Sequence, residues 1–424
     1  MKTVGIIAEY DPFHCGHAFH LNAARKEADA DYVIVVMSPD FLQRGEPALI
    51  DKWIRARMAL EAGADLVLEL PVRSAAGSAE YFAKGGVRLL DSLGCVDALS
   101  FGCEAADAFG LLEKAAHFFA KPESAQYRGI LRQRLKCGAS FPSARAQAFL
   151  SLETSSASGG SILPAGLNEG HSISGAHALR TDEIMDMLSR PNNILAVEYM
   201  KAAAQLGSSM KMIPVRRLGD YHQSIDPAAG EYASATRIRS ALLEHGMTLP
   251  EWLRSQLPPS SLTLLEGELQ NGRFVVPGDL DLLLHKELLD KREQLAEYVD
   301  IDQDLANRIN RFLNQYTGFA QFAALVKSRQ YTLTRIRRAL LHVLLGIRKD
   351  TAPVSCARVL GFRKEAQPLL HRISRHASIP LSTKLPFSML SGEDIQASHL
   401  WEMVLAHKTH KSMRHERRRR IIIL

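Results

Sequence analysis

The chain lacks the features that would place it outside a reducing compartment or in a membrane. Its 424 residues include five cysteines, an odd number without paired spacing, which argues against a disulfide framework and a zinc-type cluster. The apolar N-terminal stretch has only a strand's length and no basic leader or small-residue cleavage site, so no secretory signal is predicted. No run reaches the ~18 consecutive apolar residues of a membrane span. We therefore expect a cytoplasmic protein without membrane contact.

The sequence also lacks a convincing Ser-His-Asp or Cys-His constellation, so a covalent protein nucleophile is not predicted. Neither positive nor negative charge dominates, because the chain contains 52 Lys and Arg residues and 46 Asp and Glu residues. The resulting net charge of +6 permits a polyanionic partner without requiring one. The hydrophobic content of 46% is ample for buried cores, and the length indicates two or three domains.

The most informative stretch lies at the N-terminus. The apolar run Val4–Ala8 predicts a buried strand, Asp11 and the proline after it signal a turn, and a helical pattern begins soon afterwards. His14 and His17 flank Gly16 in that turn. A helix N-terminus favours anions, phosphate especially, and glycine permits close approach of a ligand. The pattern therefore predicts imidazoles directed at a phosphate group rather than histidines that merely pack.

Strands alternating with helices in the first half predict a parallel sheet covered on both faces. Strands are expected at Val4–Ala8, Tyr32–Met37, Leu66–Leu70, Ala98–Phe101 and Met212–Arg216, and helical segments from about Ala18 and at Arg25–Ala28, Lys52–Ala62 and Ala79–Leu93. Asp51 is expected to cap the helix that begins at Lys52. Ligands bind outside the carboxyl ends of such strands, so four residues just past strand ends are expected to converge: His14, His17, Ser38 and Gly102.

The second half has a different pattern. Residues 151–175 are rich in Ser, Gly, Ala and Thr, which predicts a flexible loop, either a cover over substrate or a plain surface connection. After residue 245 strand signals fade, and Leu-rich helical periods follow at Ile301–Gln315 and Leu333–Gly346. We expect a catalytic domain over 1–245, a mostly helical domain over 246–407 and a basic tail over 408–424. That tail is either an RNA-binding segment or a solvated end without a role.

The sequence His-x-Gly-His resembles the signature of a nucleotidyltransferase superfamily. Further stretches occur in a specific order along the chain: Phe41–Ala48, Asp51–Ala56, Asp65–Pro71, Ser100–Glu104, Pro191–Tyr199 and Ser234–Arg239. Together they resemble the bacterial tRNA(Met) cytidine acetate ligase family, densely over residues 1–245 and more thinly to about residue 400. One departure is Asp11, where the family pattern leads us to expect Asn; the turn chemistry is retained.

The resemblance implies a Rossmann-like α/β nucleotidyltransferase fold with ATP as co-substrate. Acetate would attack the α-phosphate, pyrophosphate would leave, and the acetyl-adenylate would acetylate the wobble cytidine of elongator tRNA(Met). Mg²⁺ is expected with ATP, held mainly by phosphates and water rather than by protein ligands. The expected partners are tRNA(Met) and acetate, and no obligate protein partner is inferred.

The resemblance also assigns roles to residues. His14 and His17 would be catalytic, by stabilising the pentacoordinate α-phosphate. The ATP site would comprise Ile7, Ala8, Glu9, Tyr10, Asp11, Pro12, Phe13, His14, Cys15, Gly16, His17, Ala18, Phe19, His20, Gly102, Asn192 and Arg217. Asn193 and Arg216 are second choices for the last two positions. Cys15 is taken as a neutral filler rather than a reactive thiol.

A later element, Ser-x-Thr-x-x-Arg, would hold the β- and γ-phosphates, since hydroxyls and a guanidinium suit phosphate oxygens. It comprises Ser234, Thr236 and Arg237, with Arg239 as the alternative to Arg237. The loop from Gln43 to Glu46 would hold acetate or order its surroundings. Contact with tRNA is expected on basic helical surfaces, at Arg335, Arg337 and Arg338, with Arg348, Lys349, Arg363 and Lys364 as further candidates.

Two other functions share these motifs. An adenylyltransferase acting on a small phosphorylated acceptor would use the same histidines, but such enzymes are shorter and would leave the helical half idle. A non-catalytic RNA-binding protein with a vestigial nucleotide fold is the third possibility, and the two intact motifs argue against it. Exchange of pyrophosphate into ATP, with and without acetate, separates the three.

Overall fold

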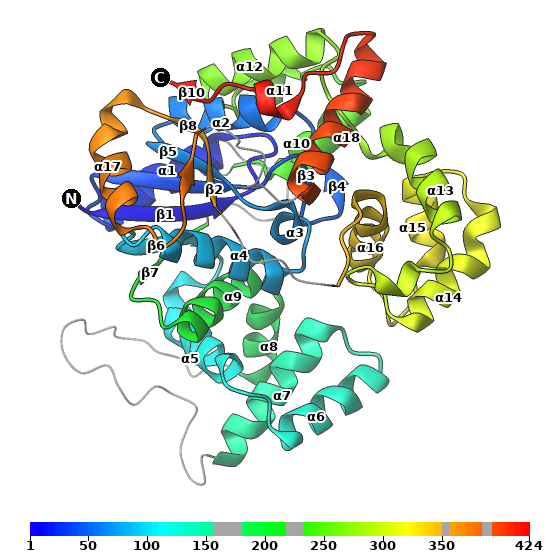
Figure 1. The fold of residues 1–424 in the computed structure, drawn as a ribbon. Coiled ribbons are helices and arrows are strands. Elements are labelled where there is room, and N and C mark those ends of the chain that lie inside the picture. Colours follow the sequence, from blue (N-terminus) through cyan, green and yellow to red (C-terminus); the bar gives the residue numbers. More distant parts are fainter. Residues whose placement is uncertain (157–179, 218–231, 350–355, 384–391) are drawn as a thin grey trace.

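A computed structural model of the chain describes residues 1–156, 180–217, 232–349, 356–383 and 392–424. Its central eight-stranded sheet follows the order β10-β8-β5-β2-β1-β6-β7, with β9 beside β8 off this path (Figure 1). The strands are β1 Thr3–Ala8, β2 Tyr32–Met37, β5 Leu66–Glu69, β6 Ala98–Cys103, β7 Lys211–Arg216, β8 Ala357–Phe362, β9 Leu381–Ser382 and β10 Ile422–Ile423. A two-stranded hairpin, β3 Phe41–Leu42 and β4 Glu46–Pro47, lies apart from this sheet.

The strands β5, β2, β1, β6 and β7 are parallel to one another. The chain builds the sheet from β1 outward to β2 and β5, and then returns to add β6 and β7 on the other side of β1. The strand order therefore reverses between β1 and β6, and this topological switch point is where open α/β sheets bind ligands. The predicted α/β architecture, with parallel strands in the first half of the chain, is confirmed.

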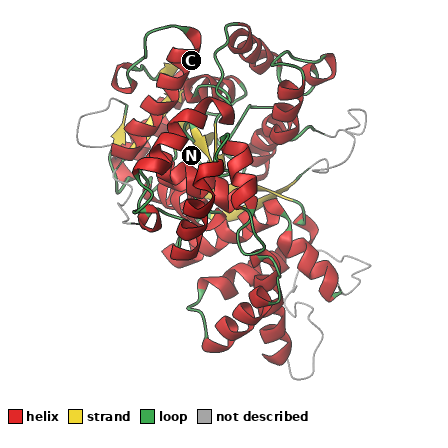
Figure 2. Cartoon of the chain, turned by 90° about the vertical axis from the view of Figure 1, so that its right-hand side faces the viewer, coloured by secondary structure: helices red, strands yellow, loops and turns green. Residues whose placement is uncertain are grey.

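Helices before residue 245 cover both faces of the sheet and extend beyond it. They are α1 Cys15–Glu27, α2 Lys52–Glu61, α3 Val72–Ala75, α4 Ala79–Ser92, η1 Ala106–Ala108, α5 Phe109–Ala120, α6 Ala125–Lys136, α7 Phe141–Ser156, α8 Thr181–Ser189, α9 Pro191–Leu206 and α10 Ala235–Glu244. Helices α5 to α9 form a lobe that projects below the sheet in Figures 1 and 2. We call it the α5–α9 lobe.

The later helices form a bundle beside the sheet and a layer above it. They are α11 Glu251–Arg254, α12 Pro259–Gln270, η3 Pro277–Leu280, α13 Asp281–Asp290, η4 Leu295–Glu297, α14 Gln303–Phe312, η5 Leu313–Gln315, α15 Phe319–Val326, α16 Leu333–Leu345, η6 Lys364–Ala366, α17 Gln367–His376, α18 Gly392–Thr409 and η7 Glu416–Arg418. Helices α13 to α16 share a core of their own. No helix among the described residues is long and apolar enough to cross a membrane.

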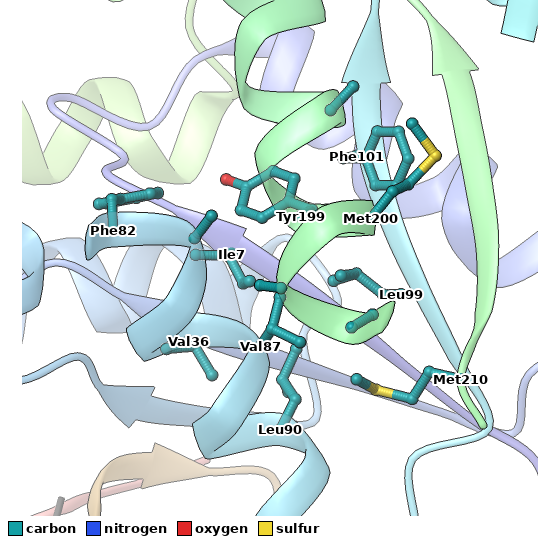
Figure 3. Close-up of a cluster of buried hydrophobic side chains, with 14 of the residues drawn as sticks. Ile7, Val36, Phe82, Val87, Leu90, Leu99, Phe101, Tyr199, Met200 and Met210 are labelled. Carbon is teal, nitrogen blue, oxygen red and sulfur yellow. The ribbon is translucent and has the colours of Figure 1, made fainter. Parts of the chain in front are cut away.

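Alternate side chains of β1 enter two different cores, as the period of a strand requires. Val4 and Ile6 join the core beneath α1, α2 and α12, whereas Ile7 joins the core beneath α4 and α9. Figure 3 shows the second core, where Val87 of α4 lies close to Ile7. Gly86 permits this approach, because a Cβ there would lie 2.6 Å from Cδ1 of Ile7. The first strand is thereby fixed from both sides.

Most predicted elements are found within a residue or two of their expected bounds. Helix α1 begins at Cys15, earlier than expected, because the His14 side chain accepts the Gly16 N–H and caps it. Helix α7 extends to residue 156, so residues 151–156 are helical and not part of a loop as predicted. Within the helix, the Ser151 hydroxyl donates to the Gln147 carbonyl oxygen at 2.8 Å. The remainder of that predicted loop, 157–175, lies outside the described residues.

The sequence pattern after residue 245 did not predict three strands, β8, β9 and β10, within the mostly helical part. The strand β8 pairs antiparallel with β5, and β10 pairs parallel with β8, so the last residues of the chain belong to the same sheet as the first. The segment 408–424, expected as a basic tail, is folded back onto the sheet: Glu416 is buried there, and Arg419 pairs with Asp51. A short apolar strand such as Ile422–Ile423 carries too little periodicity to be seen in a sequence.

A buried ion network fastens this segment to the first half. The Lys52 ammonium lies 2.7 Å from Glu69 and 2.7 Å from Glu416, and 3.3 Å from Asp40. Arg358 of β8 bridges Glu69 and Glu416 at 2.6 Å each. These five side chains come from distant parts of the sequence and are nearly inaccessible to solvent. Buried charges persist only when paired and hydrogen-bonded, so this network requires the chain's end to be in place.

Candidate active site

A cavity of about 950 Å³ opens at the carboxyl ends of β1 and β6, at the topological switch point. Its walls come from the β1–α1 turn, the end of β6, the α5–α9 lobe, the start of α10 and the N-terminal turns of α16. Most of the predicted ATP-site residues line it: Ile7, Ala8, Glu9, Tyr10, Asp11, His14, Gly16, His17, Phe19, His20, Gly102, Asn192 and Arg217.

The two motif histidines cap helix α1 with their own rings. Nδ1 of His14 accepts the Gly16 N–H at 3.1 Å, and Nδ1 of His17 accepts the His14 N–H at 3.3 Å. A neutral imidazole that accepts at Nδ1 carries its proton at Nε2, so both rings retain an Nε2–H donor. The rings stack with centroids 3.6 Å apart and line the cavity. The capping box thus fixes two donors beside a helix N-terminus without acidic residues in its first turn.

Burial keeps these imidazoles neutral. Loss of solvent, reinforced by the Arg217 charge, lowers the pKa of His14 to about 3, and the same causes lower the pKa of His20 to about 4. Burial and the neighbouring His14 hold the pKa of His17 well below its usual value. His20 also contacts the Ser100 hydroxyl at 3.1 Å. At neutral pH the three rings therefore act as hydrogen-bonding groups that gain charge only when an anion compensates them.

A second helix N-terminus meets the same cavity. The Ser234 hydroxyl caps α10 by accepting the Arg237 N–H at 3.2 Å, and Ser234 and Thr236 both line the cavity. Arg239, one turn later, donates from Nη1 to the Asp11 carbonyl oxygen at 2.6 Å and lies 3.4 Å from the Asp11 carboxylate. Two helix N-termini facing one cavity form a site suited to an extended polyphosphate.

The structure distinguishes Arg239 from Arg237, which were alternatives in the sequence. Arg239 lines the cavity, whereas Arg237 is half exposed, lies 3.6 Å from Glu244 and stacks over Trp252 at 5.5 Å. The contact between Arg239 and Asp11 also explains how a carboxylate is accommodated where we expected Asn. The other Asp11 oxygen accepts the Leu49 N–H at 2.8 Å.

A chain of hydrogen bonds holds Asn192 and Arg217 at the opposite wall. Arg217 donates to the Asn192 amide oxygen at 3.1 Å, and the Asn192 amide donates to Glu104 at 2.6 Å. Asn193 does not line the cavity; its buried amide oxygen accepts the N–H groups of Glu104 and Ala105 at 3.0 and 3.3 Å. Asn192 is thus placed to meet a ligand, and Asn193 positions the loop that holds it.

Several predicted residues lie away from the cavity. Pro12, Phe13, Cys15 and Ala18 do not line it, and neither does Ser38. Phe13 is wholly buried in the core, and the Cys15 thiol points to the Ser255 carbonyl oxygen at 3.7 Å. Burial raises the pKa of the Cys15 thiol, which makes it a poor nucleophile and agrees with its interpretation as a filler.

The two motif glycines have different surroundings. A Cβ on Gly16 would lie 2.9 Å from Cε1 of His14 and 3.2 Å from Cβ of Tyr232. Gly16 therefore makes room for the His14 ring itself, in addition to any ligand. A Cβ on Gly102 would meet nothing within 4 Å and would project into open space at the cavity wall, so its role would be to keep that space available.

Sequence reasoning missed a buried clamp under the site. The Arg55 guanidinium is inaccessible and donates to the backbone carbonyl oxygens of Ile50, Glu9 and Ser38 at 3.1, 2.7 and 3.1 Å, and also to that of Pro39. It thereby holds the ends of β1 and β2 together beneath the motif. An arginine within a helix gives no such signal in a single sequence, because it resembles a solvated charge.

Sequence reasoning also missed a charged cluster on the lobe side of the cavity. Glu198 pairs with Arg145 and lies 3.3 Å from Lys201, which in turn pairs with Glu80 at 2.6 Å. The Arg145 guanidinium stacks on Phe119, 3.8 Å from the ring centroid. All five line the cavity. The signal that could have revealed the cluster is Glu198 itself, an acidic residue on the apolar side of α9.

The arginines expected to bind tRNA are engaged in pairs within the chain. Arg335 lies 3.0 Å from Asp302, Arg338 lies 2.9 Å from Asp300, and Arg337 pairs with Glu46 of the β3–β4 hairpin. Among the further candidates, Arg348 pairs with Glu297 at 2.6 Å and Arg363 lies 3.7 Å from Glu365. Lys349 donates to the Ala296 carbonyl oxygen. Lys364 is exposed and has no such pair within the described residues.

Comparison with known proteins agrees with this site. The nucleotide-type sheet, the paired histidines at α1 and the second helix N-terminus define a HIGH-type nucleotidyltransferase, and the model of the family described as HIGH Nucleotidyl Transferase matches residues 1–417. A relative from Thermoanaerobacter sp. (strain X514), named tRNA(Met) cytidine acetate ligase, is 36% identical over 391 residues, covering 91% of this chain and 89% of the relative. The relative of the same name from Acetivibrio thermocellus is 35% identical over 395 residues, covering 91% and 88%. The chain belongs to the tRNA(Met) cytidine acetate ligase family.

Solved structures support the same conclusion. The crystal structure of Thermotoga maritima TmcAL bound with alpha-thio ATP matches with a TM-score of 0.84 at 28% identity, and each chain is covered completely. The apo form of the same protein matches with a TM-score of 0.85 at 29% identity, again over both whole chains. The fold is therefore shared over the length of both chains.

Proposed function

We propose that this chain activates acetate with ATP and transfers the acetyl group to the wobble cytidine of elongator tRNA(Met). A carboxylate oxygen of acetate attacks the α-phosphorus, and the bond to the departing pyrophosphate breaks. The exocyclic amine of cytidine then attacks the acetyl carbon of the mixed anhydride. The bond between that carbon and the phosphate oxygen breaks, the amine loses a proton, and AMP leaves. The anhydride is itself the activated species, which agrees with a site that needs no protein nucleophile.

The observation that carries this proposal is the stacked pair His14 and His17. Each ring is neutral, each is locked by a helix cap with Nε2–H free, and both line the cavity. Negative charge that develops on the phosphates in the transition state would draw on these donors. Donors that are fixed before the reaction, in a site with little solvent, provide much of the transition-state stabilisation in reactions of this kind.

The surrounding residues would take complementary roles. Ser234, Thr236 and Arg239 at the N-terminus of α10 would hold the β- and γ-phosphates, and Asn192 and Arg217 would contact the nucleotide from the opposite wall. We assign adenylation to residues 1–245, which supply every cavity residue except Thr334 and Arg338 of α16. We assign tRNA contact to the remaining helical part together with the surface described in the next subsection. The free cysteines support a reducing, cytoplasmic setting.

Mg²⁺ fits this site as a companion of ATP. In the part of the chain that the structure describes, there is no group of three or more His, Cys, Asp or Glu side chains arranged to hold a metal. Glu9 and Asp11 face the cavity, but each accepts a backbone N–H, from Gln43 and Leu49 at 2.8 Å. Burial also raises the pKa of Glu9. Phosphate oxygens and water would therefore supply most of the ligands.

The test is isotope exchange between pyrophosphate and ATP, measured with acetate, without acetate and with a phosphorylated small acceptor. We expect exchange that depends on acetate, followed by acetylation of a tRNA(Met) transcript, detected by mass analysis of the wobble nucleoside. Exchange only with a phosphorylated acceptor would replace this proposal with the adenylyltransferase. Absence of exchange under all three conditions, with tRNA still bound, would indicate an RNA-binding protein.

The variant His14→Asn separates catalysis from helix capping. Asparagine is a good N-cap, so its side-chain oxygen can replace Nδ1 and the free energy of unfolding should stay within about 1 kcal/mol of the parent. The Nε2–H donor is lost, so exchange should fall by about 10²- to 10³-fold. The exposed His371→Asn serves as the matched control and should leave both measurements unchanged. Exchange at the parent rate in His14→Asn would contradict the assigned role.

A further inference from the structure

Helix α6 at the outer end of the α5–α9 lobe has one basic face. Arg128, Arg132 and Lys136 recur at every fourth position, so they lie along one side over about 12 Å. All three are exposed, as is Arg134 on an adjoining face. Across the described ranges of the chain, none of the four side chains is ion-paired, in contrast to the arginines of α16. The segment 121–136 contains five basic residues and a single acidic one.

The packing of α6 on α7 sets the direction of this face. Tyr127 and Leu131, one position earlier in each turn, are buried against Ala144 and Ala148 of α7. Successive residues of a helix are rotated about its axis by about 100°. Burial of Tyr127 and Leu131 therefore turns the basic side chains that follow each of them toward solvent. The Ser124 hydroxyl caps the helix by accepting the Tyr127 N–H at 3.1 Å, which sets where the basic face begins.

The basic face is continuous with the cavity. Lys121, Ser124 and Tyr127 line the cavity, so the N-terminal turn of α6 forms part of its rim. Phe141, the first residue of α7, lies on the same rim with 55% of its surface exposed. Proteins bind unstacked nucleotides and their phosphates by combining exposed aromatic rings with basic side chains, and here such a ring lies at the cavity rim at the start of the helix that packs on α6.

We propose that α6 and Phe141 form the surface that receives the RNA substrate. The stripe of Arg128, Arg132 and Lys136 binds backbone phosphates, and the Phe141 ring stacks on a base next to the one that enters the cavity. This inference rests on the proposed function and adds a location to it. The substrate's reactive base must leave its stack to reach the adenylate, and a ring at the rim replaces part of the stacking that is lost. An anionic membrane would need no such ring, so RNA is the partner that both features favour.

The test compares two triple variants of the full chain. R128Q/R132Q/K136Q removes the stripe, and K26Q/R88Q/K211Q removes three exposed charges that neither line the cavity nor lie in the part assigned to tRNA contact. Binding of an elongator tRNA(Met) transcript is measured over a range of salt concentrations. We expect the stripe variant to bind tRNA at least about 10-fold more weakly at low salt. The slope of the logarithm of the binding constant against the logarithm of the salt concentration should be shallower by about 2. The control variant should match the parent.

Phe141→Ala provides a second, independent readout. Loss of one stacked base should weaken binding by about 5-fold or more without changing the salt dependence. Acetate-dependent exchange should be unchanged in the stripe variant and in the control variant, because none of their substituted residues lines the cavity. If the stripe variant and the control bind tRNA equally, the inference is overturned; it is overturned too if the stripe governs binding to phosphatidylserine vesicles and not to tRNA.

The outcome for the proposed function is read separately. A parent chain that binds tRNA through the stripe but shows no acetate-dependent exchange would sustain this inference and reject the acetate chemistry. If the parent shows acetate-dependent exchange and the stripe variant binds tRNA as the parent does, the acetate chemistry is sustained and this inference is rejected.

Discussion

The motif histidines serve the structure and the site with different atoms of one ring. Nδ1 closes the first turn of α1, and Nε2–H is left for a ligand. Under the proposed function, this division accounts for histidine at both positions: asparagine would also cap the helix but would offer its remaining donors in another place. It also explains the neutral state, because a protonated ring could not accept the N–H that it caps. The identity of these residues was predictable from the sequence, whereas their tautomer depends on a capping geometry that only coordinates reveal.

Burial of neutral histidines makes the free protein sensitive to acid. The folded-state pKa values of His14 and His20, about 3 and about 4, lie below the unfolded value near 6.5. The unfolded chain therefore binds more protons below pH 6.5, and the free energy of unfolding falls as the pH is lowered. Each such histidine should remove about 2 kcal/mol between pH 7 and pH 5. Denaturant titrations of the ATP-free protein at the two pH values measure this loss.

The variant His20→Gln isolates one of these histidines. Glutamine can still contact the Ser100 hydroxyl but does not titrate. The free energy of unfolding of the variant should therefore fall by about 2 kcal/mol less than that of the parent between pH 7 and pH 5. His371→Gln, at an exposed position, should follow the parent. Identical pH dependence in both variants would show that His20 is not held neutral by the fold.

At the scale of elements, the C-terminal segment completes the sheet and neutralises Lys52. The sequence allowed strands β1, β2, β5, β6 and β7 and helices α2 and α4 to be predicted, because apolar runs and caps are local signals. The Asp51 cap is confirmed, since its carboxylate accepts the Trp53 N–H at 2.7 Å. The partnership of Lys52 with Glu416 was not predictable. It joins residues more than three hundred positions apart, and a charged residue in a helix is taken as solvent-exposed until its partner is known.

Removal of the charge on Glu416 tests this partnership. Its carboxylate accepts from both Lys52 and Arg358, and these two cations lower its pKa to about 2 against the opposing effect of burial. Glu416→Gln should reduce the free energy of unfolding at pH 7 by about 3 kcal/mol, because it leaves buried cations undercompensated. Glu365→Gln, which alters an exposed pair, should change it by less than about 0.5 kcal/mol. Equal effects in chemical denaturation would refute a structural role for the buried network.

At the scale of the whole molecule, the sheet is built from both sides of residue 245. The strand β5 has β8 as its outer neighbour, and the cavity is closed on one side by α16. A fragment of residues 1–245 would expose the β5 edge and leave Lys52 and Glu69 without Arg358 and Glu416. Such unpaired groups are costly, and open edges promote aggregation. The sequence signalled two regions by their periodicity, but it could not show that the second region returns strands to the first.

We therefore expect the 1–245 fragment to lack a cooperative thermal transition and to bind a hydrophobic dye, as compact states with loose packing do. Co-expression with residues 246–424 should restore a single transition and ATP binding. Circular dichroism and calorimetry of the fragment, alone and with its complement, measure both. A fragment that melts cooperatively and binds ATP alone would establish an autonomous domain and contradict the dependence on β8 and β10.

The position of Glu416 has a consequence for biosynthesis. Lys52 is translated more than three hundred residues before the Glu416 carboxylate that neutralises it. Until that carboxylate has left the ribosome, the nascent chain holds Lys52 without this counter-ion, and an unpaired charge opposes burial. Nascent chains stalled before Glu416 should therefore be digested by protease around Lys52 more readily than chains stalled well beyond it.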